Sequence, residues 1–443
     1  MSRYWAESAL LPGGVSHNVL FSIAGDVFDR IEAGQPQGDA HRLPGVVLPG
    51  FANTHSHAFH RALRGRTHAE GGTFWTWRSR MYDAAARLTP DNYLKLARAA
   101  YAEMALSGIT SVGEFHYVHH NPDGTPYDNP NAMGEALQQA AREAGVRLTL
   151  LDTCYLTGGL TSDGHQPLAP EQARFGDSDV SRWAERVSRL WDDGTTQIGA
   201  AVHSVRAVPE RDLVALAHYA RDGLQVRAIH AHVSEQPAEN QACQAFYGRT
   251  PVRLLADTGL LEADFTAVHA THLTDDDIKT LGAADATASF CPTTERDLAD
   301  GIGPARELLD AGARVSLGSD QHAVIDMFEE VRGLESHERL RTLHRGRLLP
   351  DELLAAATAH DTIGWGEAGA LRAGAKADLV AVDLGSPRTA GVPAQFVLTA
   401  ATAADVTDVI RDGEVVVADR RHRFGDVGHL LTEAIDDLWE VEV

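Results

Sequence analysis

Short hydrophobic runs and longer segments of helical periodicity alternate through most of this chain of 443 residues. A short run rich in β-branched residues, followed by a longer helical segment, is typical of a buried strand in an α/β protein. We predict eight such strands, which are Val46–Asn53, Ile109–Phe115, Val146–Cys154, Gln197–Val202, Val226–His232, Thr266–Ala270, Ala286–Phe290 and Arg314–Gly318.

The segments between these runs carry helix signals. Thr89 is followed by Pro90, a cap and a proline at the first helical position, and the helix is expected to end at Gly108. Further helices are predicted over Met327–Arg345 and Pro350–His360. Eight strand and helix units in series predict an α/β fold, a (β/α)8 TIM-like barrel whose active site lies at the carboxyl ends of the strands.

Both ends of the chain have a strand-like pattern without the alternating helical segments of the middle. Residues 1–48 contain short strands separated by turns, and strand-like patterning returns in Ala377–Asp383 and Val406–Val417. We therefore expect residues 1–48 and 366–443 to form a small β-sandwich domain beside a barrel of residues 49–365.

The composition and charge of the chain limit the kinds of partner and the location that it can have. A formal charge of −23 argues against nucleic acid or an anionic membrane as the main partner. No amino-terminal signal pattern and no membrane-spanning apolar run is found. The three cysteines, Cys154, Cys243 and Cys291, form no Cys-x-x-Cys pair, so we expect neither a disulfide framework nor a thiolate metal site. A cytoplasmic location follows as the expectation.

Histidines at the strand ends indicate a metal site. His55 and His57 are spaced i, i+2 at the end of the first run, and a strand sends such a pair to the same side. His232 and Asp320 end two later runs, so that the four residues would hold one divalent metal, zinc or iron, with a position left for water. His230 is expected to be a buried, hydrogen-bonded neighbour.

The joint pattern resembles the amidohydrolase superfamily, and specifically its mononuclear deaminase branch. The matching motifs are His55-x-His57, His232-x-x-Glu235, His269 and Ser319-Asp320. The end of the fourth strand, Val202–Arg206, lacks the bridging lysine or glutamate of binuclear relatives, which favours one metal. The resemblance implies that Asp320, both ligand and base, and His269 prepare the attacking water, and that Glu235 shuttles a proton to the departing nitrogen.

Several stretches are similar to the formimidoylglutamate deiminases within that superfamily. They are Phe74–Arg78, Glu114–His120, His203–Val208 and Cys291–Glu295. The resemblance implies hydrolysis of N-formimino-L-glutamate to N-formyl-L-glutamate and ammonia in histidine degradation, and a homodimer. It also implies that Arg78, Tyr117 and Arg206 contact the carboxylates of a small dicarboxylate substrate, with His203 nearby. Guanidinium groups suit this task because they bind carboxylates bidentately.

Three positions depart from the family pattern. His60, at the position expected to contact the formimino group, replaces a glutamine, and Arg296 and Asp297 replace a small residue and an asparagine. Two other functions stay open: a deaminase of a guanine-like or cytosine-like ring, and a metal-free binding protein, which is expected to have lost metal ligands.

Other conspicuous residues have a simpler interpretation. His116, His119, His120 and His272 are expected to be structural or surface groups, and Trp75 and Trp77 to pack under the loop after the first strand. Arg61, Arg64 and Arg66 fit a solvated helix face and receive no role.

Overall fold

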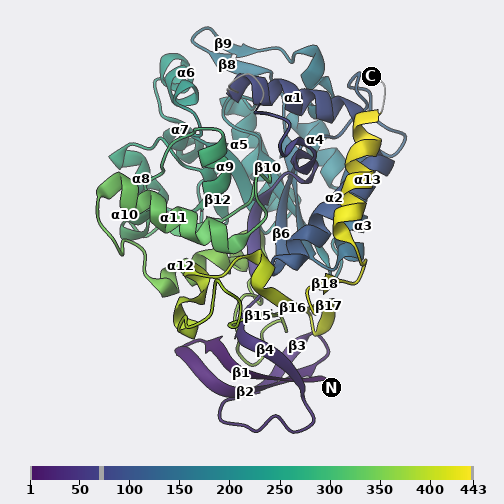
Figure 1. The fold of residues 1–443 in the computed structure, drawn as a ribbon. Coiled ribbons are helices and arrows are strands. Elements are labelled where there is room, and N and C mark those ends of the chain that lie inside the picture. Colours follow the sequence, from purple (N-terminus) through teal and green to yellow (C-terminus); the bar gives the residue numbers. More distant parts are fainter. Residues whose placement is uncertain (1, 69–73, 441–443) are drawn as a thin grey trace.

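The computed structural model, which describes residues 2–68 and 74–440, contains a closed barrel of eight parallel strands (Figure 1). In sheet order these are β5 (Phe51–Ser56), β6 (Ile109–His116), β7 (Arg147–Cys154), β10 (Thr196–Val202), β11 (Ile229–Val233), β12 (Phe265–His269), β13 (Thr287–Phe290) and β14 (Arg314–Leu317). The last strand meets the first through a parallel bridge between Ser56 and Asp320 and a hydrogen bond from the Asp320 N–H to the His55 carbonyl of 3.0 Å. The predicted barrel is confirmed.

Helices surround the barrel. They are α1 (Phe74–Arg87), α2 (Pro90–Leu106), α3 (Ala132–Ala144), α4 (Val180–Val187), α5 (Glu210–His218), α6 (Pro237–Tyr247), α7 (Pro251–Asp257), α8 (Asp275–Ala283), α9 (Pro292–Asp297), α10 (Ala305–Asp310), α11 (Met327–Thr342) and α12 (Pro350–Ala357). The predicted start of α2 is confirmed, because the Asn92 N–H donates to Thr89 Oγ1 and the Thr89 N–H donates to Asn92 Oδ1. No described helix combines the length and apolarity needed to cross a membrane.

The first predicted strand, Val46–Asn53, is wrong in its bounds. Residues 46–48 end β4 (His41–Leu48), which belongs to the second sheet, and the barrel strand begins only at Phe51. Pro49 has no N–H to donate to a ladder, and a side chain at Gly50 would meet Thr110 Oγ1 at 2.2 Å. The chain therefore changes sheets at Pro49-Gly50, although its apolar pattern continues through the break.

Strands from both termini form the second sheet, as predicted. Its order is β18 (Arg421–His422), β17 (Glu414–Ala418), β16 (Val406–Arg411), β15 (Leu379–Val382), β4, β1 (Ser2–Leu11), β2 (Gly14–Ala24) and β3 (Val27–Glu32). Its core includes Phe21, Phe28 and Leu379. The sheet lies at one end of the barrel, while α1 and the hairpin of β8 (Gly159–Thr161) and β9 (Gly164–Gln166) lie at the other (Figure 1).

The last described segment corrects the expected extent of the small domain. Residues 427–440 form helix α13 (Val427–Glu440), which packs along the barrel helices instead of joining the sheet (Figure 1). Trp439 Nε1 donates to the Ala62 carbonyl at 3.2 Å, and Lys95 pairs with Asp437 at 2.7 Å. Leu431 and Leu438 are buried, so an apolar stripe at helical spacing holds this helix on the barrel.

Candidate metal centre and its pocket

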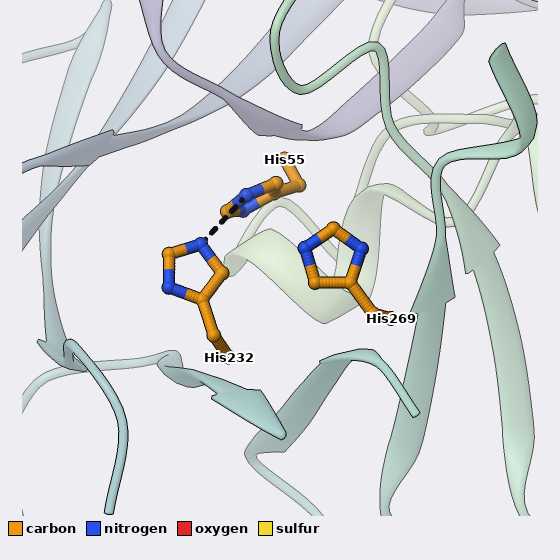
Figure 2. A group of neighbouring side chains, drawn as sticks. All are labelled: His55, His232 and His269. Atoms are coloured by element: carbon orange, nitrogen blue, oxygen red, sulfur yellow. Dashed lines mark hydrogen bonds between the residues drawn. The ribbon is translucent and has the colours of Figure 1, made fainter. Parts of the chain in front are cut away.

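The four predicted metal ligands lie together at the carboxyl ends of the barrel strands. His55 Nε2 lies 3.2 Å from His232 Nε2, and Asp320 Oδ1 lies 3.4 Å from Nε2 of both His55 and His57. Nitrogen ligands at 2.0–2.1 Å from a tetrahedral zinc are separated by about 3.3 Å. Ligand atoms within 4.8 Å of one another form two groups that share His55, one with His57 and Asp320 and the other with His232 and His269. Figure 2 shows the His55 and His232 rings facing a shared space with His269.

Hydrogen bonds on the far side of two rings leave their Nε2 atoms available as ligands. His57 Nδ1 lies 2.8 Å from the Phe115 carbonyl, and His232 Nδ1 lies 2.9 Å from the His203 carbonyl. A carbonyl can only accept, so each Nδ1 carries the proton and each Nε2 presents a lone pair. Burial lowers the pKa of His57 to about 3 and that of His232 well below its usual range, so both imidazoles are neutral, as a metal ligand must be.

Backbone conformation places the other groups at the rim. His269 has a φ of 69° and Asp320 a φ of 42°, left-handed values that non-glycine residues adopt at a cost and that recur at functional sites. Gly318 lets β14 approach β5 closely, because a side chain there would meet the His55 Cβ at 2.7 Å. Close packing of these two strands sets the position of His55 against Asp320.

His269 lies among three carboxylates. Its Nε2 is 3.8 Å from Glu235 Oε1 and 3.9 Å from Asp320 Oδ2, and its Nδ1 is 3.6 Å from Glu295 Oε1. Burial alone would lower the pKa of His269, but the carboxylates raise it to about 10. His269 also lies close to two of the predicted ligands, in a group with His55 and His232 whose ligand atoms are within 4.8 Å of one another.

A cavity of about 530 Å³ opens over the donors. All five residues predicted to bind substrate line it, together with Glu235, His269 and Asp320; the five are His60, Arg78, Tyr117, His203 and Arg206. Its volume falls within the range of small-molecule sites, 300–1,000 Å³. The barrel thus gathers the predicted residues around one space.

The two arginines of the cavity are each held by neighbouring side chains. Arg206 donates from NH2 to Glu235 Oε2 at 3.3 Å and from Nε to Ser204 Oγ at 3.1 Å, and its Nε lies 3.7 Å from Glu239 Oε2. Arg78 donates from Nε to the Tyr82 hydroxyl at 2.8 Å. Arg206 is therefore part of the pocket wall and not an exposed surface ion pair.

The three departures from the family pattern have different surroundings. His60 is buried beside the donors, and its Nε2 lies 2.9 Å from the Tyr117 hydroxyl. Arg296 and Asp297 line a separate cavity of about 370 Å³, where Arg296 pairs with Glu329 at 2.8 Å. Of the three, only His60 lines the main pocket.

Five other histidines were expected to be structural or surface groups, namely His116, His119, His120, His230 and His272, and three of them donate to backbone carbonyls. His230 Nε2 donates to the Thr362 carbonyl, His119 Nε2 to the Thr153 carbonyl and His272 Nε2 to the Asp300 carbonyl. His116 is buried, and His120 lies 3.5 Å from Asp177. Trp77 lines the main pocket and packs edge-on against His60, whereas the side chain of Trp75 lies outside the described part of the structure.

The expectation of a solvated arginine face fails for two residues. Arg61 and Arg64 converge on Glu103 at 2.6 and 2.7 Å, and both are largely shielded from solvent. They join the segment after β5 to helix α2.

The sequence reasoning missed several pocket residues. Tyr155, Phe175 and Leu160 form part of its wall, Glu239 lies behind Arg206, and Glu295 lies behind His269. Glu239 stands four residues after Glu235, and Glu295 ends one of the stretches similar to the formimidoylglutamate deiminases, but neither was given a role.

Comparison with known proteins agrees with this arrangement. A model of the amidohydrolase family matches residues 46–416. The formimidoylglutamate deiminase of Pseudomonas aeruginosa is 37% identical over 440 residues, which cover 95% of this chain and 96% of that protein. A 5-methylthioadenosine/S-adenosylhomocysteine deaminase of Pelotomaculum thermopropionicum is 30% identical over 400 residues, 88% of this chain and 84% of that protein.

Solved structures share the fold over the same length. The crystal structure of an amidohydrolase from Brucella melitensis superposes with a TM-score of 0.90 at 34% identity, covering 99% of this chain and 100% of that one. An adenosine deaminase from Xanthomonas campestris with bound zinc gives a TM-score of 0.83 at 22% identity, covering 99% and 98% of the two chains. At that identity, the second comparison shows the fold alone.

Proposed function

Because the chain belongs to the amidohydrolase family and is a hydrolase that acts on carbon–nitrogen bonds, we propose that it removes ammonia from N-formimino-L-glutamate. The other product is N-formyl-L-glutamate, and the reaction is a step of histidine degradation. The likeness to the deiminase of Pseudomonas aeruginosa over nearly the whole of both chains supports this substrate.

The observation that carries the proposal is the pair of arginines in the pocket. Arg78 and Arg206 line the same cavity as the four donors, in a chain whose formal charge of −23 repels anions. A dianionic substrate needs local positive charge, and guanidinium groups bind carboxylates bidentately. We assign Arg78, Tyr117 and Arg206 to the substrate carboxylates, with His203 beside them and His60 near the formimino group.

We assign the metal to His55, His57, His232 and Asp320, with zinc as the preferred ion and iron as the alternative. Their nitrogen and oxygen donors suit either ion. A divalent cation held there supplies Lewis acidity that makes water a better nucleophile at neutral pH. One cation per chain is expected, because the described residues place no bridging lysine or glutamate at the end of β10.

The protein's own groups then move the protons. Asp320 accepts a proton from the attacking water, and His269, protonated beside Glu235 and Glu295, orients that water by hydrogen bonding. The water oxygen bonds to the formimino carbon, and a tetrahedral intermediate forms. Glu235 passes the proton taken from the water on to the terminal nitrogen, and the proton of the intermediate's hydroxyl follows by the same route. The carbon–nitrogen bond then breaks, the hydroxyl carbon becomes the formyl carbonyl, and ammonia leaves.

A second candidate is deamination of a purine-like or pyrimidine-like ring. Trp77, Tyr82, Tyr155 and Phe175 give the pocket an aromatic wall, on which a ring can stack. Adenosine-type deaminases are also among the relatives at about 30% identity. Deamination of a ring does not explain why two arginines line the pocket, so we rank this function second.

One assay separates the candidates. Purified protein is mixed in turn with N-formimino-L-glutamate, guanine, cytosine and 5′-deoxyadenosine, and the released ammonia is measured. We expect release from N-formimino-L-glutamate only. Faster release from any ring would overturn the proposed substrate.

A variant tests the role of Arg206. Removing one partner of a desolvated charge pair costs about 2–5 kcal/mol, so Arg206→Met should lower kcat/KM by roughly thirtyfold to several thousandfold. The loss should be far smaller with an analogue whose side-chain carboxylate is replaced by a neutral amide. Equal losses with both compounds would show that Arg206 does not recognise that carboxylate.

Two further parts of the proposal concern the protein as a whole. We place it in the cytoplasm, a location supported by three buried cysteines that are all free thiols. We also propose a homodimer, which size-exclusion chromatography with light scattering would test. The small molecule that the protein binds in this proposal is the dicarboxylate substrate.

A further inference from the structure

Glu239 is a buried carboxylate beside the pocket to which the proposed reaction gives no role. It lies in the first turn of α6, and its side chain is completely shielded from solvent. Oε1 accepts a hydrogen bond from the Ser234 N–H at 3.2 Å. Oε2 accepts none from any described residue and faces Arg206 Nε at 3.7 Å. A buried carboxylate oxygen without a hydrogen-bond donor is costly, so the guanidinium opposite is its main compensation.

Arg206 is shared between two carboxylates with different surroundings. Its NH2 donates to Glu235 Oε2, while its Nε side faces Glu239. Glu235 also reaches toward the reaction centre, since its other oxygen lies 3.8 Å from His269 Nε2. Glu239 has no such second contact. Nε and NH2 belong to the same edge of a guanidinium, so the two carboxylates flank one edge of Arg206, whose Nε–H donates to Ser204 Oγ. Both carboxylates line the pocket, and Glu235 is the one beside His269.

The substrate-free pairing of Arg206 with Glu235 conflicts with the proposed reaction. The Arg206 NH2 group donates to Glu235 Oε2, and so occupies one of the two oxygens through which Glu235 would take up and pass on a proton. A substrate carboxylate that takes this NH2 group would release Glu235, provided that the guanidinium stays in place.

We infer that Glu239 is a positioning residue, which holds Arg206 through the ion pair at Nε while the NH2 group passes from Glu235 to a carboxylate of the substrate. This inference rests on the proposed function, because it requires an anionic substrate. Glu239 itself touches neither the substrate nor the reacting atoms. Without it, Glu235 would be the only carboxylate among the described residues left to pair with Arg206, and substrate recognition would compete directly with proton transfer.

The kinetic test is a double-mutant cycle of Arg206→Met and Glu239→Gln. With N-formimino-L-glutamate, Glu239→Gln alone should lower kcat/KM roughly tenfold to a hundredfold, mostly through KM, because the carboxylate site loses its orientation. In the Arg206→Met background the same change should have little further effect, since residues that act through one another are not additive. Glu239→Asp, which keeps the charge, should recover part of the loss.

Thermal unfolding of the same four proteins tests the pairing without any substrate. Arg206→Met leaves a fully buried carboxylate unpaired, so its Tm should fall by several degrees, and adding Glu239→Gln should restore part of that fall. Glu330→Gln is the matched control, because Glu330 is equally buried but is satisfied by the Thr293 N–H and hydroxyl. The change in Tm caused by Glu330→Gln should simply add to the change caused by Arg206→Met.

The two arms separate this inference from the proposed function. Additive Tm shifts for Arg206→Met and Glu239→Gln would overturn the inference, whatever the substrate proves to be. Additive kinetic losses, or a Glu239→Gln loss carried by kcat alone, would overturn it as well. A wild-type protein that is inactive on N-formimino-L-glutamate would overturn the proposed function, and the unfolding cycle would still decide whether Glu239 holds Arg206.

Discussion

Replacing Glu235 by Gln is the sharpest single test of the proposed proton transfers. Glutamine has nearly the same shape but cannot gain and lose a proton near neutral pH. The loss of a general acid and base lowers turnover by about 10²–10⁴, which corresponds to about 2.7–5.4 kcal/mol of transition-state stabilisation. Glu235 lies 3.8 Å from His269 Nε2 in the pocket wall, so we expect a fall in kcat of at least about a hundredfold.

The fold and the metal should survive this change. Glu235 is not among the four donors, and Arg206 keeps Glu239 as an ionic partner in the variant. The measurements are the steady-state release of ammonia, the metal content by elemental analysis and the unfolding temperature. Glu262→Gln, which neutralises a carboxylate that is 63% exposed and remote from the pocket, is the control and should behave as the wild type.

Two results would refute the reasoning. Near-normal kcat in Glu235→Gln would mean that another group carries the proton to the leaving nitrogen. Loss of the metal in that variant would mean that Glu235 is a ligand, and the donor set would have to be redrawn.

Three further predictions concern the metal and the carboxylate network around it. Protein purified without chelators should contain close to one equivalent of divalent metal by elemental analysis; two equivalents that are both needed for activity would contradict a mononuclear centre. Gly318→Ala should weaken metal binding by at least about tenfold in a chelator competition, because the new methyl group would lie 2.7 Å from the His55 Cβ; unchanged affinity would show that the two strands can move apart. Burial raises the pKa of Glu114 to about 7, so the native state holds a proton that the unfolded state releases near pH 4.5, and stability falls as the pH rises between these values. The free energy of unfolding is measured by denaturant titration at several pH values for the wild type and for Glu114→Gln. Between pH 4.5 and a pH above 7, the wild type should lose about 3 kcal/mol more than the variant. The same pH dependence in both proteins would show that the pKa of Glu114 is not raised.

The sequence by itself determined the architecture and predicted which residues meet at one rim of the barrel. Short apolar runs alternating with helical segments indicate parallel strands, and parallel strands place all their carboxyl ends on one face. Residues as distant as His55, His232 and Asp320 could therefore be assigned to one rim before any distance was known. His55 Nε2 does lie 3.2 Å from His232 Nε2 and 3.4 Å from Asp320 Oδ1 there.

The local hydrophobic pattern did not predict where one strand ends and the next begins when both have the same periodicity. Val46–Asn53 is a continuous apolar run, and hydrophobicity does not say which of two sheets a strand joins. Only the packing of Gly50 against Thr110 shows where the chain leaves the small sheet. Helix α13 has an apolar stripe, but its docking on the barrel depends on partners such as Lys95 and Ala62, which are far away in the chain.

The electrostatics of the site were decided by the tertiary structure alone. The pKa of His269 is raised because Glu295, Glu235 and Asp320 reach it from three other parts of the barrel, and no spacing in the sequence encodes their distances. Glu239 gains its importance in the same way, through a guanidinium that arrives from the neighbouring strand end. The periodicity of a segment indicates which of its faces is buried and which is exposed. The pKa of a buried group depends instead on the distant groups that the fold brings beside it.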